Sequence, residues 1–309
     1  MSTVLQLQQS LGPHVLQVEY IWMTRVLPWV RDDVLKVIDT VDVFSSIEQK
    51  VRMFGLRDVA IDPQEEAERL RRADLIIAIQ DEEWQELQRL APSVPVITAG
   101  VDFDVVSDAG SATAGRILYV ASSNPRNCKG LRDFLRLAWP RIRSRVRHAE
   151  LMVVGGVAKV VAGRETPGVT VMGVMEDLTP LYHDAALVIN PVVAGTGAKI
   201  KTIEALARLR PIVTWPAGID GLDARLAARC DLARDWYEFA NVVVDALTTR
   251  RDRRFTVEDR AVIAELLSPE TVYASLDAAY AAYFERHRPS EPAVVTRAVS
   301  TAPAGAHAD

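Results

Sequence analysis

The feature that most constrains the fold of this chain is a regular alternation of short apolar runs with helical segments. In the second half, the runs predicted as strands are 116–121, 150–156, 169–173, 186–191 and 211–214, with helical patterns at 130–142, 177–184 and 200–208. Strands that alternate with helices form βαβ units on a parallel sheet. Strands buried on both faces are apolar along their whole length, as these runs are. The pattern therefore predicts an α/β fold with a parallel sheet.

The first half repeats this pattern with fewer units. Its predicted strands are 14–20, 34–39, 73–79 and 94–98, with a charged helix at 64–72. A small, polar stretch separates the halves, as expected of a linker. Composition and pattern together divide the chain into an N-terminal domain at 1–106, a linker at 107–115, a C-terminal domain at 116–250, C-terminal helices at 251–288 and a disordered tail at 289–309.

Charge and composition argue against several functional classes. The formal net charge is −5, whereas general nucleic-acid binders are usually basic, so we expect no nucleic-acid partner. The two cysteines, Cys128 and Cys230, lack the spacing of a structural zinc site. The chain has no secretory signal pattern and no run of about 18 apolar residues that would span a membrane. We therefore expect a cytoplasmic protein.

The most informative stretch for function is a glycine-containing loop between a strand and a helix. Residues 190–213 read NPVVAGTGAKIKTIEALARLRPIV. Gly195 and Gly197 allow the backbone to approach a ligand closely, and Thr196 can cap the helix or donate a hydrogen bond. A helix start also exposes unpaired N–H groups at the positive end of its dipole, which suits an anion. Ligands of open parallel sheets bind where such loops follow strands.

Three charged residues of the same stretch sharpen this hypothesis. Lys199 and Lys201 place positive charge at the positive end of the helix dipole, which is unfavourable unless an anion binds there. Glu204 lies about two turns into an otherwise apolar helix, where its carboxylate could accept hydrogen bonds from ribose hydroxyls. The alternative is that both lysines are solvated and that Glu204 pairs with Lys201 at i,i+3.

The second half also resembles a known family over about 116–235. The resemblance rests on the strand 116–121, SSNPRNCKGL at 122–131, LMVVGG at 151–156, and the long stretch from VTVMG to GIDGL at 169–222 with its G-x-G-x-K-x-K-x-x-E-A run. Together these resemble the nucleotide-binding domain of GT-B glycosyltransferases of the group 1, or family 4, type. The likeness implies two Rossmann-like parallel-sheet domains, of which the N-terminal acceptor domain, matched more loosely, would be shortened.

The resemblance implies a role for each matching residue. Glu204 would bind the donor ribose, and Gly195, Thr196 and Gly197 would face the diphosphate and the sugar. Lys199 and Lys201 would neutralise the diphosphate, as would Arg126 or Lys129 in the loop after the first strand of that domain. Gly173 and Val174 would meet the nucleobase. The residues expected to act in catalysis are Lys199, Glu204 and Asp42.

The implied reaction moves a hexosyl group from a nucleotide-diphosphate sugar to an acceptor, with retention of configuration. The acceptor would be a glycan, a lipid-linked glycan or a small metabolite. We expect neither a cofactor nor a metal, because the segment 102–104, Asp-Phe-Asp, lies beside the linker rather than in a strand-end loop. Fixed cations and N–H dipoles would then stabilise the charge that develops on the leaving diphosphate.

Three differences from the family pattern keep other hypotheses open. The opening strand and glycine-rich loop of the acceptor domain are not recognisable, Val41 stands where related sequences often have His, and Thr196 replaces the first acid of the usual Glu-x7-Glu pair. Asp42 could orient an acceptor hydroxyl, or cap the helix that begins near Ser45. One alternative is a degenerate, non-catalytic GT-B protein that binds nucleotide or assists a partner transferase. Another is a nucleotide-sugar epimerase.

Overall fold

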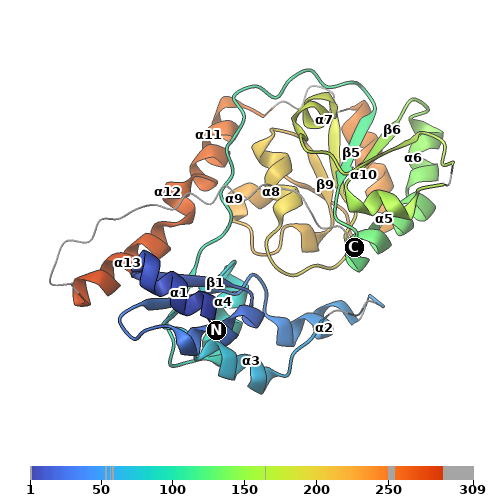
Figure 1. The fold of residues 1–309 in the computed structure, drawn as a ribbon. Helices are drawn as coiled ribbons and strands as arrows, with labels where there is room; N and C mark the ends of the chain where they lie inside the picture. Colours follow the sequence, from blue (N-terminus) through green and yellow to red (C-terminus); the bar gives the residue numbers. More distant parts are fainter. Residues whose placement is uncertain are drawn as a thin grey trace.

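The computed structural model describes residues 2–287 except 53, 56, 58, 164 and 250–254, so the expected disordered tail at 289–309 lies outside the described residues. The described chain forms two lobes, each built on a parallel sheet (Figure 1). We call the part with the four-stranded sheet the first lobe and the part with the six-stranded sheet the second lobe.

The sheet of the first lobe has the order β1-β2-β3-β4, with every neighbouring pair parallel. Its strands are β1 (Val15–Glu19), β2 (Leu35–Asp39), β3 (Leu75–Ala78) and β4 (Val96–Thr98). The helices between and before them are α1 (Ser2–Leu11), the 3-10 helix η1 (Ile21–Trp29), α2 (Phe44–Arg52), α3 (Pro63–Leu70) and α4 (Asp81–Leu90). All four residues of β3 are buried, as expected of a strand covered on both faces.

The sheet of the second lobe has the order β10-β9-β8-β5-β6-β7 and is also parallel throughout. Its strands are β5 (Arg116–Val120), β6 (Glu150–Val154), β7 (Val169–Gly173), β8 (Leu187–Asn190), β9 (Ile212–Thr214) and β10 (Asp231–Leu232). Its helices are α5 (Pro125–Leu137), α6 (Trp139–Arg145), η2 (Gly156–Val160), α7 (Thr179–Asp184), α8 (Ile200–Ala207), η3 (Pro216–Gly218), α9 (Ala224–Ala227) and α10 (Trp236–Thr248).

Helices cover both faces of the second sheet. One apolar cluster joins Tyr119 and Val153 to Phe134 of α5 and Phe239 of α10. The opposite cluster packs the sheet against α7, α8, α9 and the later helix α11 (Val257–Leu266). Because both faces of the central strands are apolar and covered, the strand-end loops remain for binding.

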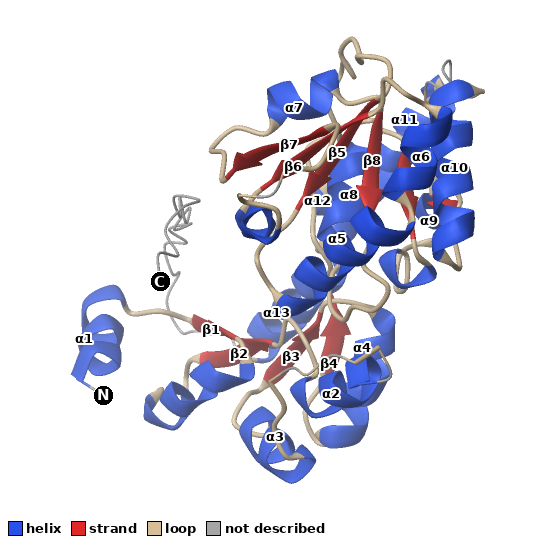
Figure 2. Cartoon of the chain, turned by 90° about the vertical axis from the view of Figure 1, so that its right-hand side faces the viewer, coloured by secondary structure: helices blue, strands red, loops and turns tan. Residues whose placement is uncertain are grey.

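The C-terminal helices return to the first lobe, which the domain boundaries predicted from the sequence do not anticipate. After α11, the chain forms α12 (Pro269–Val272) and α13 (Ala274–Arg286), and α13 lies against the first sheet (Figure 2). Leu276, Ala279 and Tyr283 pack there over Leu35 and Ile77. The other face of that sheet is covered by η1 and by α2, α3 and α4. The first lobe therefore draws on both ends of the described chain.

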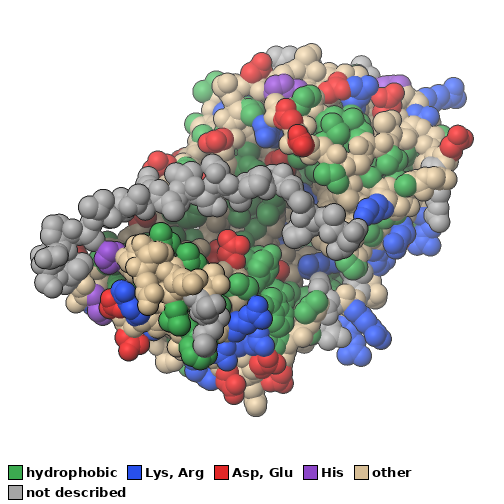
Figure 3. Space-filling view, in the orientation of Figure 1, with side chains coloured by type: hydrophobic (Ala, Val, Ile, Leu, Met, Phe, Trp, Pro, Cys, Tyr) green, Lys and Arg blue, Asp and Glu red, His purple; other side chains and the backbone are tan. Residues whose placement is uncertain are grey.

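The surface shown in the space-filling view carries acidic and basic side chains on both lobes (Figure 3). In the described part of the chain, no helix combines the length and the apolar composition that crossing a bilayer requires.

Candidate functional site

The strand order of the second sheet creates a crevice at one edge. From β5 the chain proceeds through β6 to β7, and then returns to the other side of β5 to form β8, β9 and β10. The loops that follow β5 and β8 therefore lead away from each other at neighbouring strand ends. Such a reversal of strand order is where open parallel sheets bind ligands, outside the carboxyl ends of the strands.

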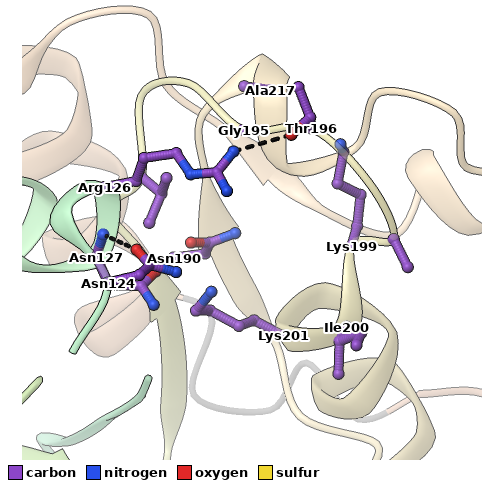
Figure 4. A pocket seen from close by; sticks show the side chains of 12 residues that line it. Asn124, Arg126, Asn127, Asn190, Gly195, Thr196, Lys199, Ile200, Lys201 and Ala217 are labelled. Carbon is purple, nitrogen blue, oxygen red and sulfur yellow. Dashed lines mark hydrogen bonds between the residues drawn. The ribbon is translucent and has the colours of Figure 1, made fainter. Parts of the chain in front are cut away.

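A pocket of about 190 Å³ lies at this crevice. It is lined by Asn124, Arg126 and Asn127 at the start of α5, by Asn190 at the end of β8, by Val192, Gly195, Thr196, Ala198, Lys199, Ile200 and Lys201 of the following loop and helix, and by Ala217 (Figure 4). The fold thus brings the predicted loop together with Arg126, which is far from it in the sequence.

The start of α5 is built to present its first turn to the pocket. The Asn124 side chain accepts a hydrogen bond from the backbone N–H of Asn127 at 2.8 Å, and Pro125 occupies the first helical position. The Asn127 amide nitrogen in turn donates to the Ser122 carbonyl at 3.1 Å. These contacts fix the positive end of a 13-residue helix dipole at the pocket.

Arg126 and Lys201 supply two positive charges to the pocket. The Arg126 guanidinium donates to Thr196 Oγ1 at 2.9 Å. Burial, followed by the charges of Arg126 and Lys199, lowers the pKa of Lys201 to about 8. Within the described part of the chain, no carboxylate forms an ion pair with Lys201. A half-buried ammonium beside like charges is stabilised by a counter-ion, so this arrangement favours an anion.

Lys201 also faces polar side chains with hydrogen-bonding capacity to spare. It extends toward the amide side chains of Asn124, Asn127 and Asn190 (Figure 4). The side-chain oxygen Oδ1 of Asn190 is buried and receives no hydrogen bond from the described residues. The pocket therefore combines cationic groups with an amide acceptor that a ligand hydroxyl or N–H could satisfy.

Lys199 points away from these amides (Figure 4). Lys199 is only 8% exposed, and its ammonium donates a hydrogen bond to the Gly197 carbonyl at 2.8 Å. Burial lowers the pKa of Lys199, although the negative charge of Asp220 opposes that effect. The two lysines that the sequence placed together thus have different surroundings.

The loop also touches the first lobe at Gly197. The carboxyl oxygen Oε1 of Glu83, in the first turn of α4, accepts a hydrogen bond from the Gly197 N–H at 3.2 Å. Gly197 has a φ of 68°, and a β-carbon added there would lie 3.0 Å from Asp42 Oδ1. Val41, next to Asp42, has a φ of 62°, which is rare for a β-branched residue. The fold therefore brings Asp42 close to the glycine loop, and its role in catalysis stays a prediction.

Glu204 follows Lys201 by three residues on α8. It does not line the pocket, and it is close to Tyr182 and Arg208. Burial raises the pKa of Glu204, while hydrogen bonding with Tyr182 and the charge of Arg208 act in the opposite direction. Its role at a ribose stays a prediction.

The remaining predicted residues are placed as follows. Gly173 ends β7 with a φ of 68°, and Val174 is 80% exposed on the loop beyond it. Lys129 pairs with Asp133 on its own helix at 2.5 Å. Both the nucleobase role of the first two residues and the diphosphate role of Lys129 stay predictions.

Sequence reasoning did not identify Asn127, Asn190 and Glu83 as site residues. Asn190 closes a predicted strand at its carboxyl end, and that position was an available signal. Asn127 and Glu83 carry no such signal, because amides and acids are ordinary residues in the first turns of helices.

Two observations bear on metal binding. The described residues contain no group of three or more His, Cys, Asp or Glu side chains that could hold a metal ion. Asp102, in the Asp-Phe-Asp segment, accepts a hydrogen bond from the Tyr273 hydroxyl at 2.6 Å and so helps to connect the C-terminal helices with the segment after β4.

Comparison with protein families decides the class of the second lobe. Residues 114–248 match the family model described as "Glycosyl transferases group 1". These residues form a group 1 glycosyltransferase domain. Among curated proteins, no sequence matches the chain.

Solved structures show that the group 1 domain and the first lobe together have the GT-B fold. Sucrose-phosphate synthase from Thermosynechococcus elongatus matches with a TM-score of 0.70 at 17% identity, over 92% of this chain and 77% of that one. HepE from Anabaena, solved with UDP-glucose, matches with a TM-score of 0.66 at 12% identity, over 91% and 81%. TarM from S. aureus matches with a TM-score of 0.60 at 12% identity, over 80% and 51%.

Proposed function

We propose that the pocket binds the diphosphate of a nucleotide-sugar donor and that the protein transfers the hexosyl group to an acceptor. The transfer would retain configuration and use no metal. The observation that carries the proposal is the uncompensated charge of the half-buried Lys201 beside Arg126, at the strand-order reversal of a group 1 glycosyltransferase domain.

The electrostatics of the pocket suit a leaving diphosphate. In sugar transfer, negative charge grows on the leaving group as the glycosidic bond breaks, so donors and cations already in place stabilise the transition state. Arg126, Lys201 and the N–H groups of the first turn of α5 would supply that stabilisation. Binding the diphosphate would also relieve the repulsion between the two cations.

The rest of the donor would extend along the carboxyl edge of the sheet. Glu204 would bind ribose hydroxyls, and the loop at Gly173 and Val174 would meet the base. The Gly195–Thr196–Gly197 backbone would face the diphosphate and the sugar, and Asp42 would approach the acceptor hydroxyl from the first lobe. The contact between Gly197 and the first lobe supports this arrangement, because it joins the two parts that such a reaction requires.

UDP is the first nucleotide to test, because structural neighbours have been solved with it. HepE is described in complex with UDP-glucose, and the pneumococcal O-GlcNAc transferase GtfA in complex with UDP and GlcNAc. At identities of 12% and 10%, these neighbours share the fold, and the base is for the experiment to decide.

The decisive measurement is calorimetric titration of the protein with UDP, GDP and dTDP. We expect one of the three nucleotides to bind. Lys201→Ala should weaken that binding by about tenfold or more, which corresponds to a loss of about 1.4 kcal/mol or more in binding free energy. Lys159→Ala is the matched control, because Lys159 is an exposed lysine in η2 of the same lobe. Equal affinities for the wild-type protein and the Lys201→Ala variant would show that the anion site lies elsewhere.

The surroundings of Lys199 favour a second candidate function, nucleotide binding without transfer. Its ammonium is held by the Gly197 carbonyl and lies among carboxylates, so it is less available to a diphosphate than the family pattern implies. Incubation with the UDP-, GDP- and dTDP-sugars separates the candidates. Release of nucleotide or a glycosylated product with retained configuration supports the transferase, whereas tight binding without turnover supports the binder.

A further inference from the structure

Glu83 is a buried carboxyl group at the contact between the two lobes. It lies in the first turn of α4, is 1% exposed, and accepts the hydrogen bond of the Gly197 N–H through Oε1. Its second oxygen, Oε2, is also buried and receives no hydrogen bond from the described residues. Gly197 belongs to the other lobe, so this one side chain connects α4 with the loop before α8.

The Gly197 backbone is enclosed on the same side by the segment after β2. A β-carbon at Gly197 would lie 3.0 Å from Asp42 Oδ1 and 3.2 Å from the Val41 carbonyl oxygen. Gly197 is itself buried, so its N–H has no access to water that could replace Glu83. The position of this peptide therefore depends on the first lobe.

The peptide held by Glu83 lies between the groups that shape the pocket. On one side, Thr196 accepts the hydrogen bond of Arg126. On the other side, Lys199 donates to the Gly197 carbonyl, and Lys201 follows in the first turn of α8. A shift of the Gly197 peptide would consequently move both the partner of Arg126 and the start of the helix that carries Lys201.

We propose that Glu83 is a positioning residue of the donor site, whose carboxyl group holds the Gly197 N–H and thereby fixes the loop of residues 195–199 in its binding shape. This inference rests on the proposed donor-binding function of the pocket. Glu83 acts through the loop and does not itself line the pocket. A side chain of the first lobe thus sets the geometry of a binding site in the second lobe.

Two substitutions separate hydrogen bonding from simple filling of space. Glu83→Gln keeps an oxygen that can accept from the Gly197 N–H, whereas Glu83→Met has a similar length but offers only a weak thioether acceptor. We expect Glu83→Gln to bind the donor nucleotide within about twofold of wild type. Glu83→Met should bind it about five- to tenfold more weakly, as expected from the loss of one buried hydrogen bond.

The experiment combines two measurements on the full-length protein. Hydrogen–deuterium exchange of the ligand-free protein should show faster exchange in peptides covering 192–200 for Glu83→Met than for Glu83→Gln and wild type. Calorimetric titration with UDP, GDP and dTDP then reports the effect on binding. Gln85→Ala is the control, because Gln85 is exposed on the same helix.

The outcomes are distinguishable. Equal exchange in the two Glu83 variants would overturn the proposed hold on the loop, whether or not a nucleotide binds. Faster exchange in Glu83→Met with unchanged nucleotide affinity would overturn the positioning role. If the wild-type protein binds none of the three nucleotides, the proposed function fails and the donor-site role fails with it, while the exchange data still report whether Glu83 holds the loop.

Discussion

At the scale of single residues, the two glycines of the Gly195–Thr196–Gly197 turn have different structural requirements. Gly197 has a φ of 68° and sits against Asp42, whereas a β-carbon at Gly195 would meet nothing within 4 Å. A left-handed conformation costs a residue with a side chain about 1–2 kcal/mol. The sequence pattern alone treats the two glycines as equivalent, because their difference arises from contact with the first lobe.

Gly197→Ala is therefore expected to impair the protein much more than Gly195→Ala. For Gly197→Ala we expect a loss of about 1–2 kcal/mol in the free energy of unfolding and at least fivefold weaker binding of the donor nucleotide. Gly195→Ala should stay within about 0.5 kcal/mol of wild type. Urea denaturation and calorimetric titration of both variants provide the check, and equal effects would contradict the left-handed conformation of Gly197.

Glu83 should also make stability depend on pH. Burial and the negative charge of Asp42 raise the pKa of Glu83 to about 8. The Gly197 N–H, Lys50 and Lys199 oppose this rise only in part. The folded protein therefore retains a proton that the unfolded chain releases near its ordinary pKa of 4.5. The associated stability is complete below the unfolded pKa and is lost as the pH rises through the folded pKa.

We thus expect the free energy of unfolding of the wild-type protein to fall, relative to that of Glu83→Gln, between about pH 5 and pH 8. Relative to Glu83→Gln, the wild-type protein should have a free energy of unfolding that is lower at pH 7 than at low pH by on the order of 3 kcal/mol. Urea denaturation of both proteins at pH 5, 6, 7 and 8 measures it. Parallel pH profiles for the two proteins would show that Glu83 is ionised in the folded state.

At the scale of elements, α13 forms one layer of the first lobe although it comes from the other end of the chain. Its apolar side packs over Leu35, Val37, Leu75, Ile77 and Ala99 of the first sheet and its strand ends. The neighbouring residues Ala278 and Ala279 differ in environment, since Ala279 packs on the sheet and Ala278 is exposed. The helix offers a test with the same substitution at adjacent positions.

Ala279→Asp should destabilise the protein by about 2 kcal/mol or more, because it places a charge against an apolar sheet. Ala278→Asp should change the free energy of unfolding by no more than about 0.5 kcal/mol. Thermal or urea denaturation compares the two. Similar stabilities would mean that α13 does not cover the sheet in solution.

The element pattern shows what the sequence can and cannot predict. The predicted strands of both halves coincide with β1–β9, because short apolar runs between turn residues are typical of strands. The two-residue strand β10 has no apolar run and was missed. The helical character of the segment after Phe255 was predicted, but not its destination, since an amphipathic pattern indicates that a helix has a buried face without indicating which sheet covers it.

The candidate site, too, could be predicted from the sequence only in part. The glycine loop and Lys201 could be predicted, because glycine spacing and charge at a helix start are local features of the sequence. The different directions of Lys199 and Lys201 could not, since they depend on the path of the loop and on carboxylates supplied by α4. Glu83 was missed because an acid in the first turn of a helix is the ordinary preference.

At the scale of the whole molecule, two connections join the lobes, and the lobes meet beside the pocket. The segment 99–115 leads from β4 to β5, and α11 to α13 lead back. The Glu83–Gly197 contact lies between the lobes beside the pocket. The pocket of the second lobe and the packing of α4 in the first lobe are consequently linked through the hydrogen bond between Gly197 and Glu83.

The return of α13 also imposes an order on biosynthesis. One face of the first sheet has no cover until residues 274–286 have been made, although its last strand is complete at Thr98. At translation rates of about 5–20 residues per second, the nascent strands would wait on the order of 10 to 40 s for their partner helix. The half of the protein that leaves the ribosome first is therefore the half that matures last, and chaperones that shield apolar strands would have their opportunity in that interval.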